Sequence, residues 1–177
     1  MASWRKISSK IIYKCPYFNI FEDKVVKPNG SRGIYHLIDE RGAVVIIALD
    51  AQNKVYLIQE EKYIPGIIWT IPAGNIEQRD KNPLFAAKRE LKEEAGVIAK
   101  KWTNLGEFLI SPGRSNGKGH VFLAQELKEG KQELDSTERI KVVKTPFKEV
   151  ITMVQKEKII DAWAIIPILK AKLLLNL

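Results

Sequence analysis

A helical repeat of apolar residues stands out between positions 82 and 97. The apolar side chains lie three or four residues apart, which places them on one side of a helix: Leu84, Ala87, Leu91 and Ala95. Asn82 is suited to cap this helix, and Pro83 suits its first turn, where a missing N–H costs nothing. Gly96 can adopt the left-handed conformation that ends many helices. The pattern therefore predicts a helix that begins near Pro83 and ends at Gly96.

Runs rich in Ile, Val, Tyr and Phe predict strands in the first half of the chain. The predicted segments are residues 11–27 (one or two strands), 33–39, 43–49 and 54–60. The turn at 28–31 would join the first two segments into a hairpin or small sheet. The run 44–49 is apolar on both faces, which predicts a central strand. We expect a loosely held arm over residues 1–10 and a passage into a loop over 63–71.

The second half continues with strands and ends in helices. Strands are predicted over residues 101–110, 119–127 and 140–144, and helices over about 146–156 and from 161 onward. Pro167 is expected to kink or restart the last helix. Helices set against a mixed sheet predict an α/β sandwich.

The composition is that of an ordinary globular protein with room for one substantial core. The net charge of +8 would suit polyanions, but lysines alternate with glutamates over residues 128–148, which favours a solvated surface over a nucleic-acid-binding one. Cys15 is the single cysteine and no secretory pattern follows the N-terminus, so we expect a cytoplasmic protein. The apolar stretch 159–177 is interrupted by charges and is too short to span a bilayer, so no membrane partner is expected.

Three carboxylates crowd one side of the predicted central helix. Glu90, Glu93 and Glu94 fall on an arc of about 100° beside the apolar stripe, with Arg89 next to them. Like charges at this spacing cost roughly 0.2–0.5 kcal/mol on an open helix. Two interpretations fit the helix alone: a solvated face paired with nearby lysines, which is the commoner case, or a site for a divalent cation with oxygen ligands.

The order of residues in this stretch favours the second interpretation, a site for a divalent cation. Residues 89–97, R-E-L-K-E-E-A-G-V, resemble without exception the R-E-U-x-E-E-x-G-U half of the Nudix box, in which U is a bulky aliphatic residue. Pro72-Ala73-Gly74 supplies the glycine that opens the box. The front half departs from the family, because Asp80 occupies the usual glutamate position and one extra residue precedes Arg89.

Further segments resemble the ADP-ribose pyrophosphatases within the Nudix hydrolases. They are Ile12-Tyr13-Lys14 with the following strand and turn, Lys62-Tyr63 ahead of Trp69, Ser111-Pro112-Gly113, and residues 147–172. The resemblance implies a Nudix-type α/β/α sandwich with a mixed sheet over residues 41–177. It also implies an N-terminal β-hairpin or sheet extension over residues 1–40 that exchanges across a homodimer.

The resemblance also implies roles for individual residues. Glu90 and Glu94 would coordinate Mg²⁺, with Mn²⁺ as an alternative, while Glu93 supports the cluster and the carbonyl of Ala73 completes part of the shell. Arg89 would orient the glutamates through charge-assisted hydrogen bonds. Glu138, in the Thr137-Glu138-Arg139-Ile140 context, is the candidate base that takes a proton from water. Its alternative is a solvated loop glutamate.

Substrate contacts rest on single residues. Arg114 would meet a phosphate or ribose, and Lys62 stands where the subfamily often has an arginine, so it offers a point charge. Trp4 or Tyr17 would stack on adenine, although packing in a core or interface is the commoner fate of such residues. Two departures remove polar groups near the expected site: Thr70 and Gly117 stand where the subfamily usually has glutamates.

The sequence thus predicts a metal-dependent hydrolase of nucleoside diphosphate-linked substrates, with ADP-ribose or a related nucleotide sugar first. The products would be a nucleoside monophosphate such as AMP and a sugar phosphate. The alternatives are enzymes for GDP-sugars, dinucleoside polyphosphates or RNA 5′ ends, and a Nudix-like module that binds nucleotide or RNA without cleaving it.

Overall fold

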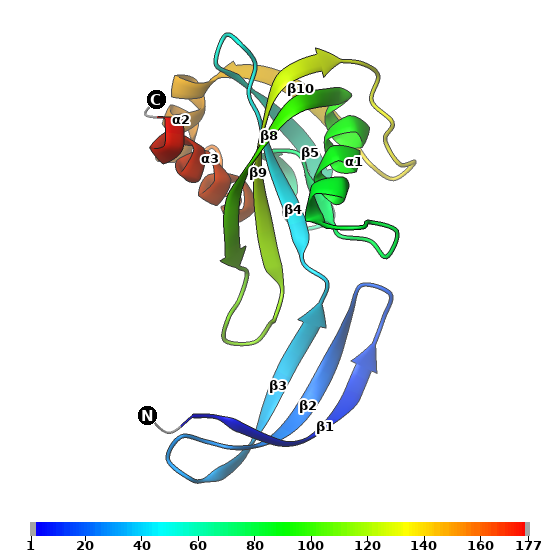
Figure 1. Ribbon diagram of the computed structural model, residues 1–177, viewed down its shortest axis with the longest axis vertical. Helices are drawn as coiled ribbons and strands as arrows, with labels where there is room; N and C mark the ends of the chain where they lie inside the picture. The colour runs from blue at the N-terminus through cyan, green and yellow to red at the C-terminus, as the bar shows by residue number, and fades with distance from the viewer. Residues whose placement is uncertain (1–2, 176–177) are drawn as a thin grey trace. The chain divides into compact units, whose positions relative to one another are not determined.

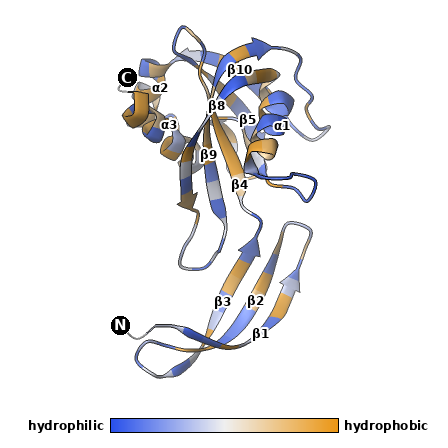
Figure 2. Ribbon diagram, viewed as in Figure 1, coloured by the Kyte–Doolittle hydropathy of each residue, from blue (hydrophilic) through white to orange (hydrophobic). Residues whose placement is uncertain are grey.

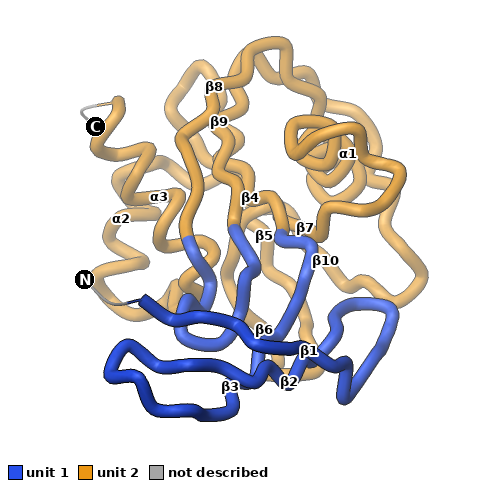
Figure 3. Tube along the Cα trace, turned by 60° about the horizontal axis from the view of Figure 1, so that its bottom comes forward, with its two compact units in different colours: residues 1–42, 109–118 blue, residues 43–108, 119–177 orange. Residues whose placement is uncertain are grey.

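The computed structural model describes residues 3–175. Its elements are, in chain order, β1 (Arg5–Lys14), β2 (Phe18–Val26), β3 (Arg32–Glu40), β4 (Ala43–Ala48), β5 (Lys54–Lys62), β6 (Gly66–Thr70), β7 (Ala73–Asn75), α1 (Pro83–Ala95), β8 (Val97–Leu109), β9 (Lys118–Glu129), β10 (Ile140–Pro146), α2 (Phe147–Gln155) and α3 (Ala162–Leu175) (Figure 1). The chain divides into two compact units, residues 1–42 with 109–118 and residues 43–108 with 119–177 (Figure 3). Each unit is described by itself below.

The first unit is an antiparallel sheet with the strand order β1-β2-β3. β1 forms one edge, and every one of its residues is exposed. The segment 109–118 joins this sheet through a bridge between Ile38 and Ser115 and a hydrogen bond from the Tyr35 hydroxyl to the Gly113 carbonyl. The expected arm over residues 1–10 is wrong from Arg5 onward. Because β1 is exposed throughout, its sequence lacks the alternation that marks a half-buried strand.

The second unit consists of sheets with helices on both faces, as the sequence predicts. In the order β7-β4-β9-β8, β4 runs parallel to β9 and antiparallel to β7, so this sheet is mixed. β5 pairs with β10 and β6 in a second sheet, which is antiparallel. α1 covers one face, and α2 and α3 cover the other (Figure 1). The architecture is an α/β/α sandwich.

β4 is the strand on which both apolar layers are built. Val44 and Ile46 pack beneath α1, whereas Val45 and Ile47 pack with residues of α2 and α3, and all four are fully buried. Figure 2 shows β4 as apolar along most of its length. Burying one such side chain contributes about 1.5–3 kcal/mol, so this strand anchors both helical layers. The predicted central strand is confirmed.

Two further expectations are corrected in this unit. The passage over residues 63–71 contains β6, and β7 follows directly after Pro72; both strands are short, and prolines flank them. α3 continues as one helix through Pro167, which is buried, so the expected restart does not occur. Among residues 3–175, no helix is long and apolar enough to cross a membrane.

Candidate active site

Helix α1 presents two carboxylates to the backbone of β7. The Asn82 side chain accepts a hydrogen bond from the Phe85 N–H at 3.1 Å, and Gly96 ends the helix with a φ of 64°, so both predicted caps are present. Leu91 is fully buried under the helix. This anchoring sets Glu90 and Glu94 at the margin of the core, where they are only 8% and 5% exposed.

β7 is fitted closely to these carboxylates. The Ala73 N–H donates to Glu94 Oε2 at 2.8 Å. A Cβ placed on Gly74 would lie 2.1 Å from Glu90 Cδ, so only glycine leaves room for that carboxyl group. Gly74 therefore has a steric role.

Arg89 links the carboxylates to the loop that precedes the helix. Its Nη1 donates to Glu90 Oε1 at 2.8 Å and to Glu93 Oε2 at 2.9 Å. Its Nη2 donates to Asp80 Oδ2 and to the Asn75 carbonyl, both at 3.1 Å, and Nε reaches Asp80 Oδ1 at 3.4 Å. Asp80 thus braces the loop through Arg89 and the Glu77 N–H.

Charge and burial act together on this network. Burial opposes ionisation of Asp80, but hydrogen bonds from Arg89 and from the Glu77 N–H prevail and lower the pKa of Asp80. Burial likewise disfavours the charge of Arg89, but its bonds to Asp80 and Glu93 and the charge of Glu90 raise the pKa of Arg89. Arg89 and Asp80 therefore form an ionised pair in which both side chains are at most 16% exposed.

The pKa values of the two inner glutamates, Glu90 and Glu94, are raised instead of lowered. The pKa of Glu90 is raised to about 7, mainly by burial; the charges of Glu93 and Glu138 contribute to this rise, and Arg89 opposes it. Burial also raises the pKa of Glu94 well above its usual value; the Ala73 N–H opposes this rise, and the charges of Glu90, Glu60 and Glu138 add to it. The pKa of a carboxyl group rises in this way when like charges gather at a poorly solvated site.

The donor set suits a hard divalent cation. In the contacts above, Glu90 and Glu94 each use one named oxygen, so a second carboxylate oxygen on each can bind a cation that offsets the crowded charge. Within residues 3–175, no three His, Cys, Asp or Glu side chains are already arranged as a metal site. The residues fit such an ion by chemistry, and the carboxylates would complete the shell together with backbone oxygen and water.

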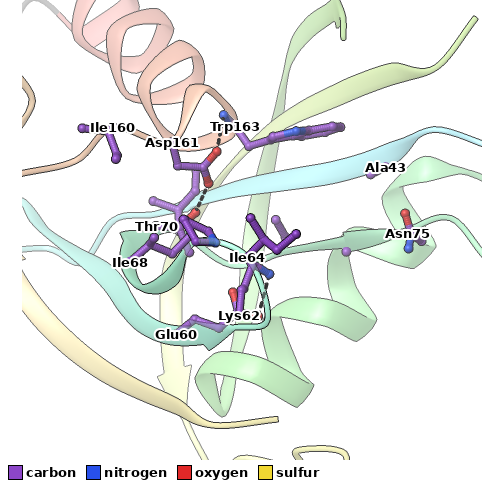
Figure 4. Close-up of a pocket in the computed structure, with 14 residues that line it drawn as sticks. Ala43, Glu60, Lys62, Ile64, Ile68, Thr70, Asn75, Ile160, Asp161 and Trp163 are labelled. Carbon is purple, nitrogen blue, oxygen red and sulfur yellow. Dashed lines mark hydrogen bonds and ion pairs between the residues drawn. The ribbon is translucent and has the colours of Figure 1, made fainter. Parts of the chain in front are cut away.

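A cavity of about 540 Å³ adjoins the acidic cluster of Glu90, Glu93 and Glu94. It is lined by Ala73 and Gly74, the β7 residues that lie against Glu94 and Glu90. Lys62 lines this cavity and its Nζ contacts Glu60 Oε1 at 2.6 Å (Figure 4). On another wall, the Thr70 hydroxyl donates to Asp161 Oδ2 at 2.7 Å. The size and mixed lining are typical of a site for a small ligand.

Several residues of this site escape prediction from the sequence. Glu60 lies on β5, and a polar position after the apolar run of that strand is the one signal that marks it. Asp161 and Trp163 come from the start of α3, about ninety positions from Thr70, and only the tertiary fold brings them to the cavity.

The structure brings together one group of the predicted residues. Arg89, Glu90 and Glu93 are joined by hydrogen bonds, Glu94 contacts Ala73, and Lys62 lines the adjoining cavity. Glu138 lies in the turn before β10, where its Oε2 accepts a hydrogen bond from the Asp135 N–H at 2.9 Å. Its charge is near enough to affect both inner glutamates.

The other predicted residues belong to the first unit. Trp4 is half exposed and packs edge-on against Tyr35, with ring centres 5.7 Å apart. Tyr17 is 76% exposed in the turn between β1 and β2. Arg114 Nε donates to Ser111 Oγ at 3.1 Å. Their part in substrate binding stays a prediction.

Gly117 also belongs to the first unit, and its surroundings explain its small size. A Cβ there would lie 2.4 Å from Glu40 Oε1, and the Ser115 hydroxyl donates to the same carboxylate. The space beside Gly117 is thus occupied by the carboxylate of Glu40 from β3.

Comparisons with known proteins agree with this geometry. Residues 39–166 match the NUDIX domain, and residues 4–38 match the nucleoside diphosphate sugar hydrolase N-terminal domain. The ADP-ribose pyrophosphatase of Bacillus subtilis (strain 168) is 32% identical over 161 residues, which cover 89% of this chain and 86% of that protein. The methanol dehydrogenase activator of Bacillus methanolicus is 28% identical over 93% of this chain and 90% of its own. The crystal structure of an ADP compounds hydrolase has a TM-score of 0.85 over 98% of this chain and 95% of its own; at 20% identity, this likeness shows the fold alone.

Proposed function

Because the chain belongs to the Nudix hydrolase family, we propose that it hydrolyses the pyrophosphate bond of ADP-ribose or a closely related nucleoside diphosphate sugar. The products are AMP, or the corresponding nucleoside monophosphate, and a sugar phosphate. The single observation that carries the proposal is the pair of buried carboxylates, Glu90 and Glu94, fixed by Arg89 and Ala73 beside a cavity of about 540 Å³. The substrate class is supported by the 32% identity to an ADP-ribose pyrophosphatase over most of both chains.

The pyrophosphate substrate carries negative charges that repel an attacking hydroxide. We assign Glu90 and Glu94, with support from Glu93 and the carbonyl of Ala73, to hold Mg²⁺ or Mn²⁺. When bound, the cation supplies positive charge that offsets the charge of the pyrophosphate and makes water easier to ionise.

The chain's own residues hold this arrangement in place. Arg89 fixes one oxygen of Glu90 and one of Glu93, and Asp80 in turn fixes the guanidinium group. The Ala73 N–H fixes Glu94. These contacts set the carboxylates before substrate arrives, so little reorganisation is needed during the reaction.

Glu138 is the proposed general base that takes a proton from the attacking water. Its charge is felt at Glu90 and Glu94, and it lies in a turn outside the strands. Glu60 also acts on Glu94, but the Lys62 ammonium engages it at 2.6 Å, whereas the Glu138 carboxylate contacts the neutral Asp135 N–H. This engagement favours Glu138 over Glu60 for the role.

Single residues are the candidates for contacts to the remainder of the substrate. Lys62 would attract a phosphate as a point charge. Arg114 would meet a phosphate or ribose, and Trp4 or Tyr17 would stack on adenine.

The N-terminal strands, which we assign to residues 1–40, are the proposed dimerisation element. β1 is an exposed edge strand, and large apolar side chains on it and just before it are roughly half exposed: Trp4, Ile7, Ile11, Ile12 and Tyr13. An exposed apolar edge of this kind is suited to pairing with another chain. Light scattering after gel filtration tests the dimer, and Ile11→Asp should shift the mass toward the monomer. A cytoplasmic location remains an expectation.

The direct test is a substrate panel with Mg²⁺ or Mn²⁺, read by chromatography of the products. The panel contains ADP-ribose, GDP-mannose, diadenosine polyphosphates and NADH. AMP formation with the highest kcat/KM for ADP-ribose supports the proposal. Preference for another member would keep the chemistry and overturn the substrate. Nucleotide binding in a chelator, with no turnover under any condition, would favour a non-catalytic binding module instead.

A further inference from the structure

Asp161 is held at the start of α3 by contacts from two directions. Its Oδ1 accepts the backbone N–H of Trp163 at 3.0 Å, and its backbone carbonyl accepts the backbone N–H groups of Ala164 and Ile165. Its Oδ2 accepts the Thr70 hydroxyl at 2.7 Å from the end of β6. A carboxylate fixed on both oxygens has little freedom to turn away, so its orientation toward a ligand is set in advance.

This carboxylate lines the cavity that adjoins the acidic cluster (Figure 4). Beside it, the Trp163 indole forms an apolar wall that is braced by Phe108, with ring centres 5.2 Å apart. Thr70 is only 3% exposed, so its hydroxyl serves Asp161 rather than solvent. The corner therefore presents an apolar surface and a rigid carboxylate.

The remaining hydrogen-bonding capacity of the Asp161 carboxylate is of one kind. Each carboxylate oxygen of Asp161 has two acceptor sites, and the contacts above use one on each. The Thr70 hydroxyl and the backbone N–H of Trp163 are already directed at Asp161. Asp161 thus offers acceptors and requires donors from a ligand.

The charge of Asp161 and its need for donors decide which part of a nucleotide sugar it can bind. A phosphate is repelled by the negative charge of Asp161. Adenine has a donor amino group but also an acceptor at N1, and that acceptor would face the carboxylate without a donor. Sugar hydroxyl groups are neutral, and each can donate.

We propose that Asp161, positioned by Thr70, binds hydroxyl groups of the sugar attached to the distal phosphate of the substrate. This inference rests on the proposed function and assigns a specificity role to a residue outside the Nudix box. It also gives a physical role to Thr70, which stands where the subfamily usually has glutamate, because its hydroxyl can orient Asp161 where a second carboxylate would repel it.

The test compares three substrates that share the scissile bond. They are ADP-ribose, the methyl ester of ADP at its β-phosphate, which lacks the sugar, and IDP-ribose, which lacks the amino group of adenine. Asp161→Asn keeps a helix-capping side chain of the same shape but removes the charge. The ratio of kcat/KM for ADP-ribose to that for the methyl ester should fall about tenfold or more, the scale of one lost hydrogen bond to a charged group.

Two further variants separate binding from structure. Thr70→Val should lower the same ratio, and Thr70→Ser should restore it. Asp50→Asn is the matched control, because Asp50 Oδ1 accepts backbone N–H groups at 2.9 and 2.8 Å in a turn away from the cavity, and its ratio should equal that of the wild type. The loss should fall mainly on KM, as expected for binding that is uniform along the reaction.

Each other outcome overturns the inference in a recognisable way. Equal losses on ADP-ribose and the methyl ester in Asp161→Asn would show a structural role only. If Asp161→Asn changes the preference for ADP-ribose over IDP-ribose but leaves the ratio to the methyl ester intact, then Asp161 contacts adenine and not the sugar. If the wild type cleaves none of the three substrates, the proposed function fails first and the inference falls with it.

Discussion

The close fit of Gly74 against Glu90 yields a quantitative prediction. In Gly74→Ala, the new Cβ would lie 2.1 Å from Glu90 Cδ and Oε1 and 2.6 Å from Oε2. Carbon and oxygen atoms need roughly 3.4 Å or more, so the carboxyl group or β7 must move by about 1 Å. Overpacking of this kind costs about 1–3 kcal/mol of stability. A shift of about 1 Å in a reacting group costs about 10²-fold in rate.

We therefore expect kcat/KM for ADP-ribose to fall about 10²-fold in Gly74→Ala, while urea unfolding shows a loss of about 1–3 kcal/mol. Gly130→Ala is the matched control, since the nearest atom to its Cβ, the Gly96 carbonyl oxygen, is 3.4 Å away. Its rate should stay within about twofold of the wild type.

A double-mutant cycle identifies the cause of the clash. Glu90→Asp shortens the side chain by one methylene, so the stability cost of Gly74→Ala should shrink by about 0.5–3 kcal/mol in that background. If Gly74→Ala keeps wild-type kcat/KM, or if its stability cost is the same in the wild-type and Glu90→Asp backgrounds, the steric account of the box glycine is refuted.

Two further predictions concern the charged groups around α1. The pKa of Asp80 is lowered in the folded state, so Asp80 contributes stability above its ordinary pKa of 3.8, and this contribution is lost as pH falls through the lowered value. The Asp80→Asn variant should not show this loss on acid unfolding, and urea titration at pH 7 should find it about 3 kcal/mol less stable than the wild type. Arg79→Ala is the control, because this side chain is exposed and its loss should change stability by under about 0.5 kcal/mol. Added Mg²⁺ at 100 times its Kd should stabilise the wild type by about 2.7 kcal/mol in thermal unfolding, and an equal gain in Glu90→Gln would argue against Glu90 as a ligand.

Local signals in the sequence predict α1 and its surroundings well. Asn82, Pro83 and Gly96 act within one turn of the helix ends, so their roles follow from neighbouring residues alone. The strand β4 is equally easy to predict from the sequence, because both of its faces are buried and every position is apolar. The Nudix box adds Arg89 and the glutamates through a resemblance, and the hydrogen bonds of Arg89 agree with the expected orienting role.

Contacts between distant segments are less accessible to sequence reasoning. Thr70 and Asp161 lie 91 positions apart, and Gly117 and Glu40 become neighbours only when the loop returns to β3. The first part of β1, residues 5–10, was missed for a different reason: a strand exposed on both faces needs no apolar alternation. Sequence reasoning therefore reaches α1 and Lys62, but not Glu60, Asp161 and Trp163 in the cavity beside them.

The most direct measurement of the central claim is the rate of ADP-ribose cleavage by the wild type and by Glu94→Gln with saturating Mg²⁺. The wild type should release AMP and a sugar phosphate in equal amounts. The variant keeps an acceptor for the Ala73 N–H but loses the charge, and its kcat should fall about 10²–10³-fold, the scale for removing one group that stabilises transition-state charge. Undiminished cleavage by Glu94→Gln, or a wild type that forms no AMP, would contradict the account.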